Sequence, residues 1–193
     1  INTSEEDIHV HRLMSMQMDM DMPGYVVSTF HGAWAREMQR DDFQVTSGKF
    51  VNSSYTGTSS NRSNPFFMLH NVRTTEDFGP CYGFNLIYSG NHYSCVEVSS
   101  HGKTRVISGM NPQSFDFLLS PGMTLEAPES VMTFSDGGFN GMSQQMHAFV
   151  REHIVRGVWK KKDRPVLLNS WEACYFSFDE ERLKKIGSCC ADL

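Results

Sequence analysis

The chain has 193 residues, of which 39% are hydrophobic and 20% charged, and its formal net charge is −5. This composition excludes a disordered chain, and the length is typical of one domain or of one domain with part of another. The acidic charge argues against a nucleic-acid partner, and no apolar run approaches the roughly 20 residues that a membrane-spanning helix needs.

The first predicted element is a β-strand over residues 8–22, because hydrophobic residues occupy alternate positions there. Methionines supply most of that face, and Arg12 is the one break in the alternation. A row of methionines could bind a soft metal, but the sequence favours a flexible core face, since Met fills irregular cores. The pattern begins almost at residue 1, which we interpret as a sign that a preceding portion is missing.

Short segments separated by turns follow this strand. Residues 25–30 predict a strand, residues 33–40 fit either a helical turn or an edge strand, and residues 43–55 alternate again. The loop at 56–64 reads TGTSSNRSN, and an apolar strand is predicted directly after it at 66–69. Such a loop is typical of a solvated turn, although its hydroxyls and amides could also face a sugar.

Six more strands are predicted in the middle of the chain, each bounded by Gly, Pro or Asn. They cover residues 82–89, 93–99, 104–107, 115–119, 124–127 and 131–134. Short strands with turns of this kind are typical of an antiparallel sandwich. Since roughly ten strands exceed one small sheet, we expect two packed sheets.

The hydrophobic period changes after the glycine pair at 137–138. Hydrophobic residues now recur on one helix face, at Met142, Met146, Phe149, Val150 and Ile154. We predict a helix there, with Asn140 as its N-cap. His147 and His153 have no second ligand at helical spacing, so we interpret them as surface or core-edge histidines rather than metal ligands.

Residues 164–178 (RPVLLNSWEACYFSF) combine a short apolar run with a helix start. The apolar run predicts a buried strand, and Ser177 with Glu180 forms a capping box. A strand that leads into a capped helix is how a parallel βα unit begins. Because the chain reaches Leu193 before a second parallel strand, we expect it to stop at the start of a second domain.

The five cysteines are odd in number and include no C-x-x-C pair. This pattern predicts a reduced, cytoplasmic protein without a disulfide framework or a zinc site. The sequence contains no nucleophile elbow, no phosphate-binding glycine loop and no evident acid–base pair of carboxylates. The residues alone therefore describe a β-sandwich of unknown purpose joined to the first unit of another fold.

Six long stretches resemble glycoside hydrolase family 36, the bacterial-type α-galactosidases. They are MSMQMDMDMPGYVVSTFHGAWARE (14–37), YTGTSSNRSNPFFML (55–69), YGFNLIYSGNHY (82–93), GKTRVISGMNPQSFDFLLSPG (102–122), ESVMTFSDGGFNGMSQQMHAFVREHIVRGVW (129–159) and RPVLLNSWEACYFSFDEERL (164–183). The resemblance implies a mainly β chain: an antiparallel β-supersandwich, partial, at 1–138, a linking helix and linker at 139–163, and the start of a (β/α)8 barrel at 164–193.

The resemblance also implies hydrolysis of terminal α-galactosides of the melibiose and raffinose type, with retention of configuration. That mechanism uses two carboxyl groups roughly 5–5.5 Å apart, which in the family lie on later barrel strands. We therefore expect no catalytic residue, no metal and no cofactor in this chain, and no activity from it alone. Its expected partners are the missing catalytic barrel and further copies of itself, joined through the β domain. Transferase relatives within the family remain an alternative to hydrolysis.

The SWEACYF segment matches the family's barrel-opening motif, which implies that Trp171 walls the sugar pocket. An indole face can stack on the apolar C–H face of galactose, and active sites of such barrels form at the C-terminal ends of the strands. Asn169 and Glu172 are neighbouring candidates for substrate binding. The alternative is that Trp171 is a core residue on the barrel floor.

Three departures from the family pattern accompany these matches. Cys174 stands where threonine is usual, Asn61 and Ser63 differ from a histidine pattern, and the sequence GSCC at 187–190 predicts an interrupted helix. The alternative function is a non-catalytic carbohydrate-binding or assembly module. The partnerless βα unit argues against that alternative, because a self-contained module would leave its apolar faces uncovered.

Overall fold

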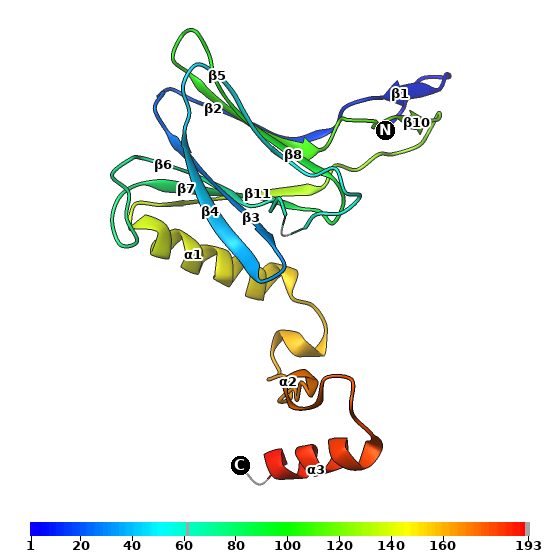
Figure 1. The fold of residues 1–193 in the computed structure, drawn as a ribbon. Coiled ribbons are helices and arrows are strands. Elements are labelled where there is room, and N and C mark those ends of the chain that lie inside the picture. The colour runs from blue at the N-terminus through cyan, green and yellow to red at the C-terminus, as the bar shows by residue number, and fades with distance from the viewer. Residues whose placement is uncertain (61, 192–193) are drawn as a thin grey trace. The chain divides into compact units, whose positions relative to one another are not determined.

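The computed structural model describes residues 1–60 and 62–191, and the chain divides into two compact units, Ile1–Phe149 and Val150–Leu193. The first unit is built from strands followed by one helix (Figure 1). The strands are β1 (Ile8–Val10), β2 (Met14–Met20), β3 (Val26–Ala33), β4 (Arg36–Gln44), β5 (Gly48–Ser53), β6 (Phe67–His70), β7 (Cys81–Ile87), β8 (His92–Val98), β9 (Thr104–Met110), β10 (Phe117–Leu119) and β11 (Glu129–Ser135), and the helix is α1 (Gly138–Phe149). Neighbouring strands pair antiparallel, which confirms the predicted mainly β, antiparallel fold.

Two sheets face each other in the first unit. One has the strand order β11-β7-β6-β3-β4 and the other the order β2-β9-β8-β5. Val27, Leu69 and Phe84 from the first sheet pack with Val96 and Val106 from the second in one buried cluster. The main core therefore lies between the sheets, and the predicted two-sheet sandwich is confirmed.

Helix α1 covers the other face of the five-stranded sheet (Figure 1). Its residues Phe139, Met142 and Met146 form a second buried cluster with Met68 of β6 and Cys81 of β7. The central strands of this sheet are thus covered on both faces. This arrangement explains why β6 is buried along its whole length and has no polar–apolar alternation at 67–69.

The predicted strand at 8–22 forms as two strands. β1 pairs with β10 in a separate two-stranded sheet, whereas β2 pairs with β9. The alternation is confirmed in β2, where Gln17 and Asp19 are exposed and Met20 is buried. The ladder shifts register after Met14, where a Cβ atom on Gly109 would come within 2.6 Å of the Met14 Cα atom.

Three other details of the first unit differ from or refine the predictions. The charged segment at 33–40 is not a helical turn: Ala33 ends β3, residues 34–35 form the hairpin turn, and residues 36–40 begin the edge strand β4. The strand predicted at 124–127 is wrong, because that segment is mostly exposed and pairs with no described strand. Asn140 is not the N-cap of α1: the helix begins at Gly138, and the Asn140 N–H donates to the Glu76 carbonyl.

The second unit contains short helical segments and one longer helix. A π-helical turn at Val150–Ile154 and a 3-10 turn at Val158–Lys160 precede α2 (Trp171–Cys174) and α3 (Glu180–Ala191). The strand predicted after Pro165 does not form in this structure: residues 163–170 have no regular secondary structure, and the Val166 side chain is 98% exposed. A barrel strand is held by hydrogen bonds to its neighbours, and no strand in the described part of the chain lies beside this segment.

Helix α3 is capped differently from the prediction. The Asp179 carboxylate accepts a hydrogen bond from the Arg182 N–H at 2.8 Å, so Asp179 rather than Ser177 caps the helix. The helix continues through residues 187–190, so the expected interruption is wrong. A Cβ atom on Gly187 would meet open space, which indicates that this glycine is not required by packing. Across the described residues, every helix is too short or too polar to cross a membrane.

Candidate aromatic site

The three residues predicted to bind substrate lie within one turn of the second unit. The Asn169 Oδ1 atom accepts a hydrogen bond from the Trp171 backbone N–H at 2.9 Å. Asn favours this local turn because its side chain can bond the backbone two residues later. Glu172 is the next residue of α2 and is exposed. The sequence Asn169-Ser170-Trp171-Glu172 therefore folds locally into a single polar and aromatic turn.

Two further aromatic rings contact Trp171. The ring of Tyr175 lies 5.4 Å from the indole at 76°, and that of Phe176 lies 4.9 Å from it at 90°. The Tyr175 N–H donates to the Trp171 carbonyl at 2.7 Å, which closes the turn. The sequence pattern singles out neither ring, although Tyr175 is four residues from Trp171, a spacing at which helical side chains meet.

The aromatic cluster of Trp171, Tyr175 and Phe176 is accessible from solvent. Trp171 is 44% exposed in this chain, and the other two rings are more exposed. Cys174, in contrast, is buried, so a small side chain suits this position. Exposed aromatic rings that lie together form a surface on which an apolar ligand face can bind.

Helix α3 is tied to this turn by one arginine. Arg182 donates from Nη1 to the Ser177 carbonyl at 3.1 Å and from Nη2 to the Ala173 carbonyl at 3.4 Å. The Ala173 bond satisfies a carbonyl group of the last turn of α2, which the helix leaves unpaired, and the Ser177 bond holds the loop that follows. The Asp179 cap and the Arg182 bonds together fix the segment that carries Tyr175 and Phe176.

The side chains of this turn can bind a ligand through aromatic, amide and carboxylate groups. Within residues 1–60 and 62–191, no three His, Cys, Asp or Glu side chains are placed to hold a metal ion. His147 and His153 are both exposed, and at the start of α3 the acid Glu180 pairs with Lys184. An aromatic surface beside a carboxylate and an amide suits an uncharged polar ligand with one apolar face, such as a sugar.

The second candidate, the loop at 56–64, is tied to the sandwich by its own polar groups. The Ser63 carbonyl accepts from His92 Nε2 at 2.8 Å, and the Asn64 carbonyl accepts from Asn52 Nδ2 at 2.8 Å. His92 is buried, and burial lowers the pKa of its imidazole. Asn61 lies outside the described residues. The interpretation of this loop as a structural turn is therefore supported by its contacts, with Ser63 occupied in holding it.

Two family models together match almost the whole chain. Residues 1–120 match the glycosyl hydrolase family 36 N-terminal domain, and residues 124–193 match melibiase. The division between the matches falls before β11, so the last strand and α1 belong to the melibiase match although they pack on the sandwich.

Relatives of known activity match the same region. Alpha-galactosidase AgaA of Geobacillus stearothermophilus is 38% identical over 192 residues, which cover 100% of this chain and 26% of the relative. The structure of alpha-galactosidase AgaB from the same organism is 39% identical with a TM-score of 0.93, covering 99% of this chain and 26% of that one. The structure of a variant of AgaA in complex with raffinose has a TM-score of 0.91 at 39% identity. The match covers 96% of this chain and 26% of that one. The chain thus spans about a quarter of the length of the relatives it matches.

Proposed function

Because this chain belongs to glycoside hydrolase family 36, we propose that it is the part of an α-galactosidase that joins the β-supersandwich to the catalytic barrel. The parent protein hydrolyses terminal α-galactosides such as melibiose and raffinose, with retention of configuration. The observation that carries this proposal is the pair of family matches, which meet between residues 120 and 124 and cover both parts of one enzyme. The raffinose complex of the related AgaA supports the substrate class.

We propose the same three segments that the sequence suggested: β-supersandwich at 1–138, linking helix and linker at 139–163, and the first strand and helix of the barrel at 164–193. The exposure of Val166, Leu167 and Phe176 supports the last segment, because apolar side chains of this kind are buried on both faces of a parallel barrel strand. In the parent protein these residues pair with neighbouring barrel strands and become covered.

Trp171 binds the galactose ring in this proposal, with Asn169 and Glu172 as neighbours. Its accessible indole and the supporting rings of Tyr175 and Phe176 suit stacking on the C–H face of a sugar. The nucleophile and the acid/base belong to the remainder of the parent protein, so the isolated chain does not hydrolyse α-galactosides.

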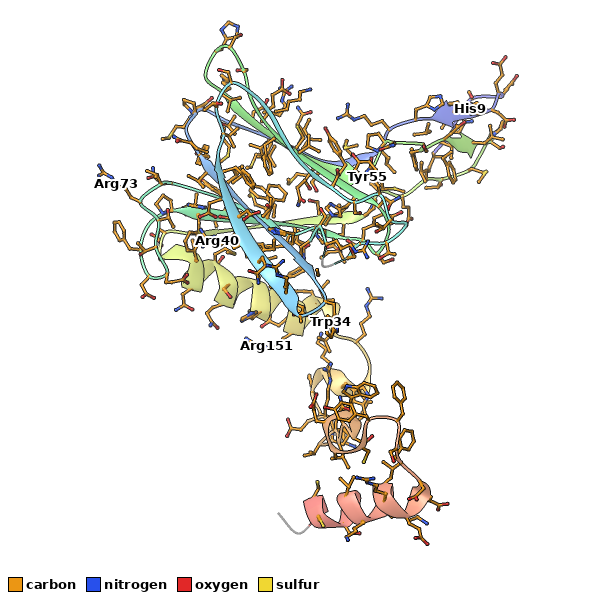
Figure 2. All side chains as sticks on the ribbon, viewed as in Figure 1. His9, Trp34, Arg40, Tyr55, Arg73 and Arg151 are labelled. Atoms are coloured by element: carbon orange, nitrogen blue, oxygen red, sulfur yellow. The ribbon has the colours of Figure 1, made fainter. Side chains whose placement is uncertain are left out.

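We further propose that the parent protein is a cytoplasmic homo-oligomer that associates through its β domain. Trp34, at the tip of the β3–β4 hairpin, is 93% exposed (Figure 2), and Met38 on β4 is exposed as well. Exposed large apolar side chains on one hairpin support a protein contact there. Five free cysteines support a reducing compartment, and the acidic net charge disfavours nucleic acid as a partner.

A chimera tests the catalytic proposal. In it, residues 1–193 replace the matching quarter of AgaA, and turnover of p-nitrophenyl α-galactoside is measured for the chimera and for the chain alone. We expect turnover from the chimera and none from the chain. A folded but inactive chimera, together with raffinose binding by the chain alone, would instead support the non-catalytic carbohydrate-binding module.

A further inference from the structure

Four polar side chains form a connected network on the face of the five-stranded sheet that α1 covers. They are Ser28 on β3, Arg40 and Asp42 on β4, and His70 on β6, and none belongs to the aromatic site. Ser28 is 0% exposed and His70 4% exposed. Buried polar groups are costly unless they are paired, so the arrangement of hydrogens within this network matters for stability.

Asp42 receives three hydrogen bonds in the network. Ser28 Oγ donates to Asp42 Oδ1 at 2.6 Å, Arg40 Nε donates to the same oxygen at 2.7 Å, and Arg40 Nη2 donates to Oδ2 at 2.9 Å. Burial raises the pKa of Asp42, but the hydrogen bonds from Arg40 and Ser28 outweigh it and hold the pKa below its ordinary value. Asp42 is therefore ionised at neutral pH, and the Ser28 hydrogen is committed to it.

The tautomer of His70 follows from its backbone neighbour. His70 Nδ1 lies 2.8 Å from the Asn71 carbonyl oxygen, which can only accept, so Nδ1 carries the hydrogen. In the neutral ring Nε2 is then an acceptor. It lies 2.9 Å from Ser28 Oγ and 3.4 Å from Arg40 Nη2. Because the Ser28 hydrogen points to Asp42, Nε2 of neutral His70 accepts its hydrogen bond from Arg40 Nη2.

Adding a proton to His70 reverses the role of Nε2. The protonated ring donates from Nε2 to Ser28 Oγ, and Ser28 still donates to Asp42, so a continuous chain of hydrogen bonds forms. The Arg40 Nη2–H group then faces another N–H group and a second positive charge, which removes its contact with His70. Arg40 and a solvent proton thus compete for the same nitrogen lone pair.

Arg40 also connects β4 to α1. Its guanidinium carbon lies 4.4 Å from the centroid of the Phe139 ring, and the His70 ring meets Phe139 edge-on at 4.8 Å. Phe139 is in the first turn of α1, and Figure 2 shows Arg40 on the edge strand β4. A change at His70 Nε2 therefore acts on the contact between this edge strand and the helix.

We propose that His70 is a proton-operated switch that controls how firmly Arg40 holds β4 against α1. With neutral His70, Arg40 bridges Asp42, His70 and Phe139. With protonated His70, Ser28 takes over the imidazole contact, Arg40 is released from His70, and β4 loosens.

Few other groups on this face titrate. Burial raises the pKa of the Cys81 thiol on β7, so it stays neutral throughout the range in which histidine titrates. The residues of α1 that pack on the sheet, Phe139, Met142 and Met146, carry no charge, and neither do Thr133 and Ser135 on β11. The pair of His31 with Asp41 occupies the alternate positions of β3 and β4, on the opposite face.

The direction of the pH dependence follows from the environment of His70. Burial lowers the pKa of this imidazole, and the Arg40 charge lowers it further, against opposing contributions from the Asn71 carbonyl and Asp42. The unfolded chain therefore binds a proton at higher pH than the folded one. Stability contributed by neutral His70 is complete above the ordinary value of 6.5 and is lost as the pH falls from there to the folded pKa.

The test uses the 193-residue chain and three variants: Arg40→Gln, His70→Gln, and His147→Gln as a control at an exposed histidine of α1. The His70 pKa is measured by NMR of the imidazole nitrogens. Amide exchange of β4 and β11 is compared between neutral and mildly acid pH, after correction for intrinsic rates. We expect Arg40→Gln to raise the His70 pKa by ~0.5–1 unit, because a nearby positive charge is removed.

In the unmodified chain and in His147→Gln, we expect β4 to lose several-fold more protection than β11 on acidification, and in His70→Gln this difference disappears. The proposal is overturned by an unchanged His70 pKa in Arg40→Gln, or by the same acid response of β4 in His70→Gln. Should His70→Gln fail to fold, the Arg40→Gln titration decides alone, since Arg40 is partly exposed and belongs to neither buried hydrophobic cluster.

Discussion

Gly138 lies so close to Thr75 that a Cβ atom on Gly138 would come within 2.4 Å of the Thr75 carbonyl oxygen. The contact exists because the loop before β7 caps α1. The Phe139 N–H donates to the Thr75 carbonyl at 3.1 Å, and the next amide of the helix donates to Glu76. Carbonyl groups from a distant loop thus satisfy the unpaired amides with which a helix begins.

Substituting Gly138 tests this cap. Gly138→Ala adds both the clash and a side chain at φ 73°, so we expect a loss of about 3 kcal/mol in the free energy of unfolding. The matched control is Gly122→Ala, where φ is 78° but a Cβ atom meets open space. We expect this substitution to lower the free energy of unfolding by only about 1–2 kcal/mol, the cost of a side chain at positive φ. Urea denaturation followed by circular dichroism measures both, and equal losses would contradict the close approach.

The core between the sheets depends on stacked aromatic rings. Phe84 is fully buried and stacks on Phe67 with ring centroids 4.9 Å apart. We expect Phe84→Ala to cost about 3–5 kcal/mol of unfolding free energy through the cavity it leaves. Phe43→Ala, at an exposed ring of β4, should cost less than about 1 kcal/mol in the same urea titration. Similar losses of unfolding free energy at the two positions would contradict the assignment of Phe84 to the core between the sheets.

Two substitutions distinguish the observed cap of α3 from the predicted one. Asp179→Ala removes the acceptor of the Arg182 N–H, and we expect a loss of about 1 kcal/mol in local helix stability. This loss corresponds to roughly fivefold faster amide exchange in the first turn of α3. Ser177→Ala should leave exchange nearly unchanged. A larger effect of Ser177→Ala than of Asp179→Ala on amide exchange would instead support the capping box of Ser177 and Glu180.

The role of Trp171 is tested in the active chimera. Trp171→Ala removes the proposed sugar-stacking surface, so we expect kcat/KM for raffinose to fall by about 10–100-fold. Trp159→Ala is the control: this tryptophan is 43% exposed, close to the 44% of Trp171, and its ring lies 5.7 Å from Lys162 Nζ. Equal effects of the two substitutions on kcat/KM would argue against a specific sugar contact at Trp171.

The sequence predicted the strands well where local signals define them. The methionine alternation of β2 and the Gly, Pro and Asn turns between β7 and β9 depend on neighbouring residues alone. Residues 124–127 have the same local composition as a short strand but have no described strand beside them. The cap of α1 was missed for a related reason, because Thr75 is more than sixty residues away from the helix that it caps.

The candidate sites show the same division between local and long-range information. Trp171 came from the family resemblance, and no periodicity in the chain singles it out. Ser28, Asp42 and His70 come from three different strands, and only the pairing of β3 with β4 and β6 brings them together. The one sequence signal for this network is His70 itself, a polar residue that directly follows the apolar run Phe67-Met68-Leu69.

Strand β4 ends the five-stranded sheet, and Arg36, Glu37, Arg40, Asp41 and Asp42 give it alternating patches of both charges. A foreign strand that added itself to this border would have to desolvate those charges, so the border resists the open-ended stacking that leads to fibrils. In the proposed homo-oligomer, the exposed tryptophan at the hairpin tip would make the contact between copies, and the charged backbone edge of β4 would stay unpaired. The charges along β4 thus favour a folded protein whose sheet ends at this strand.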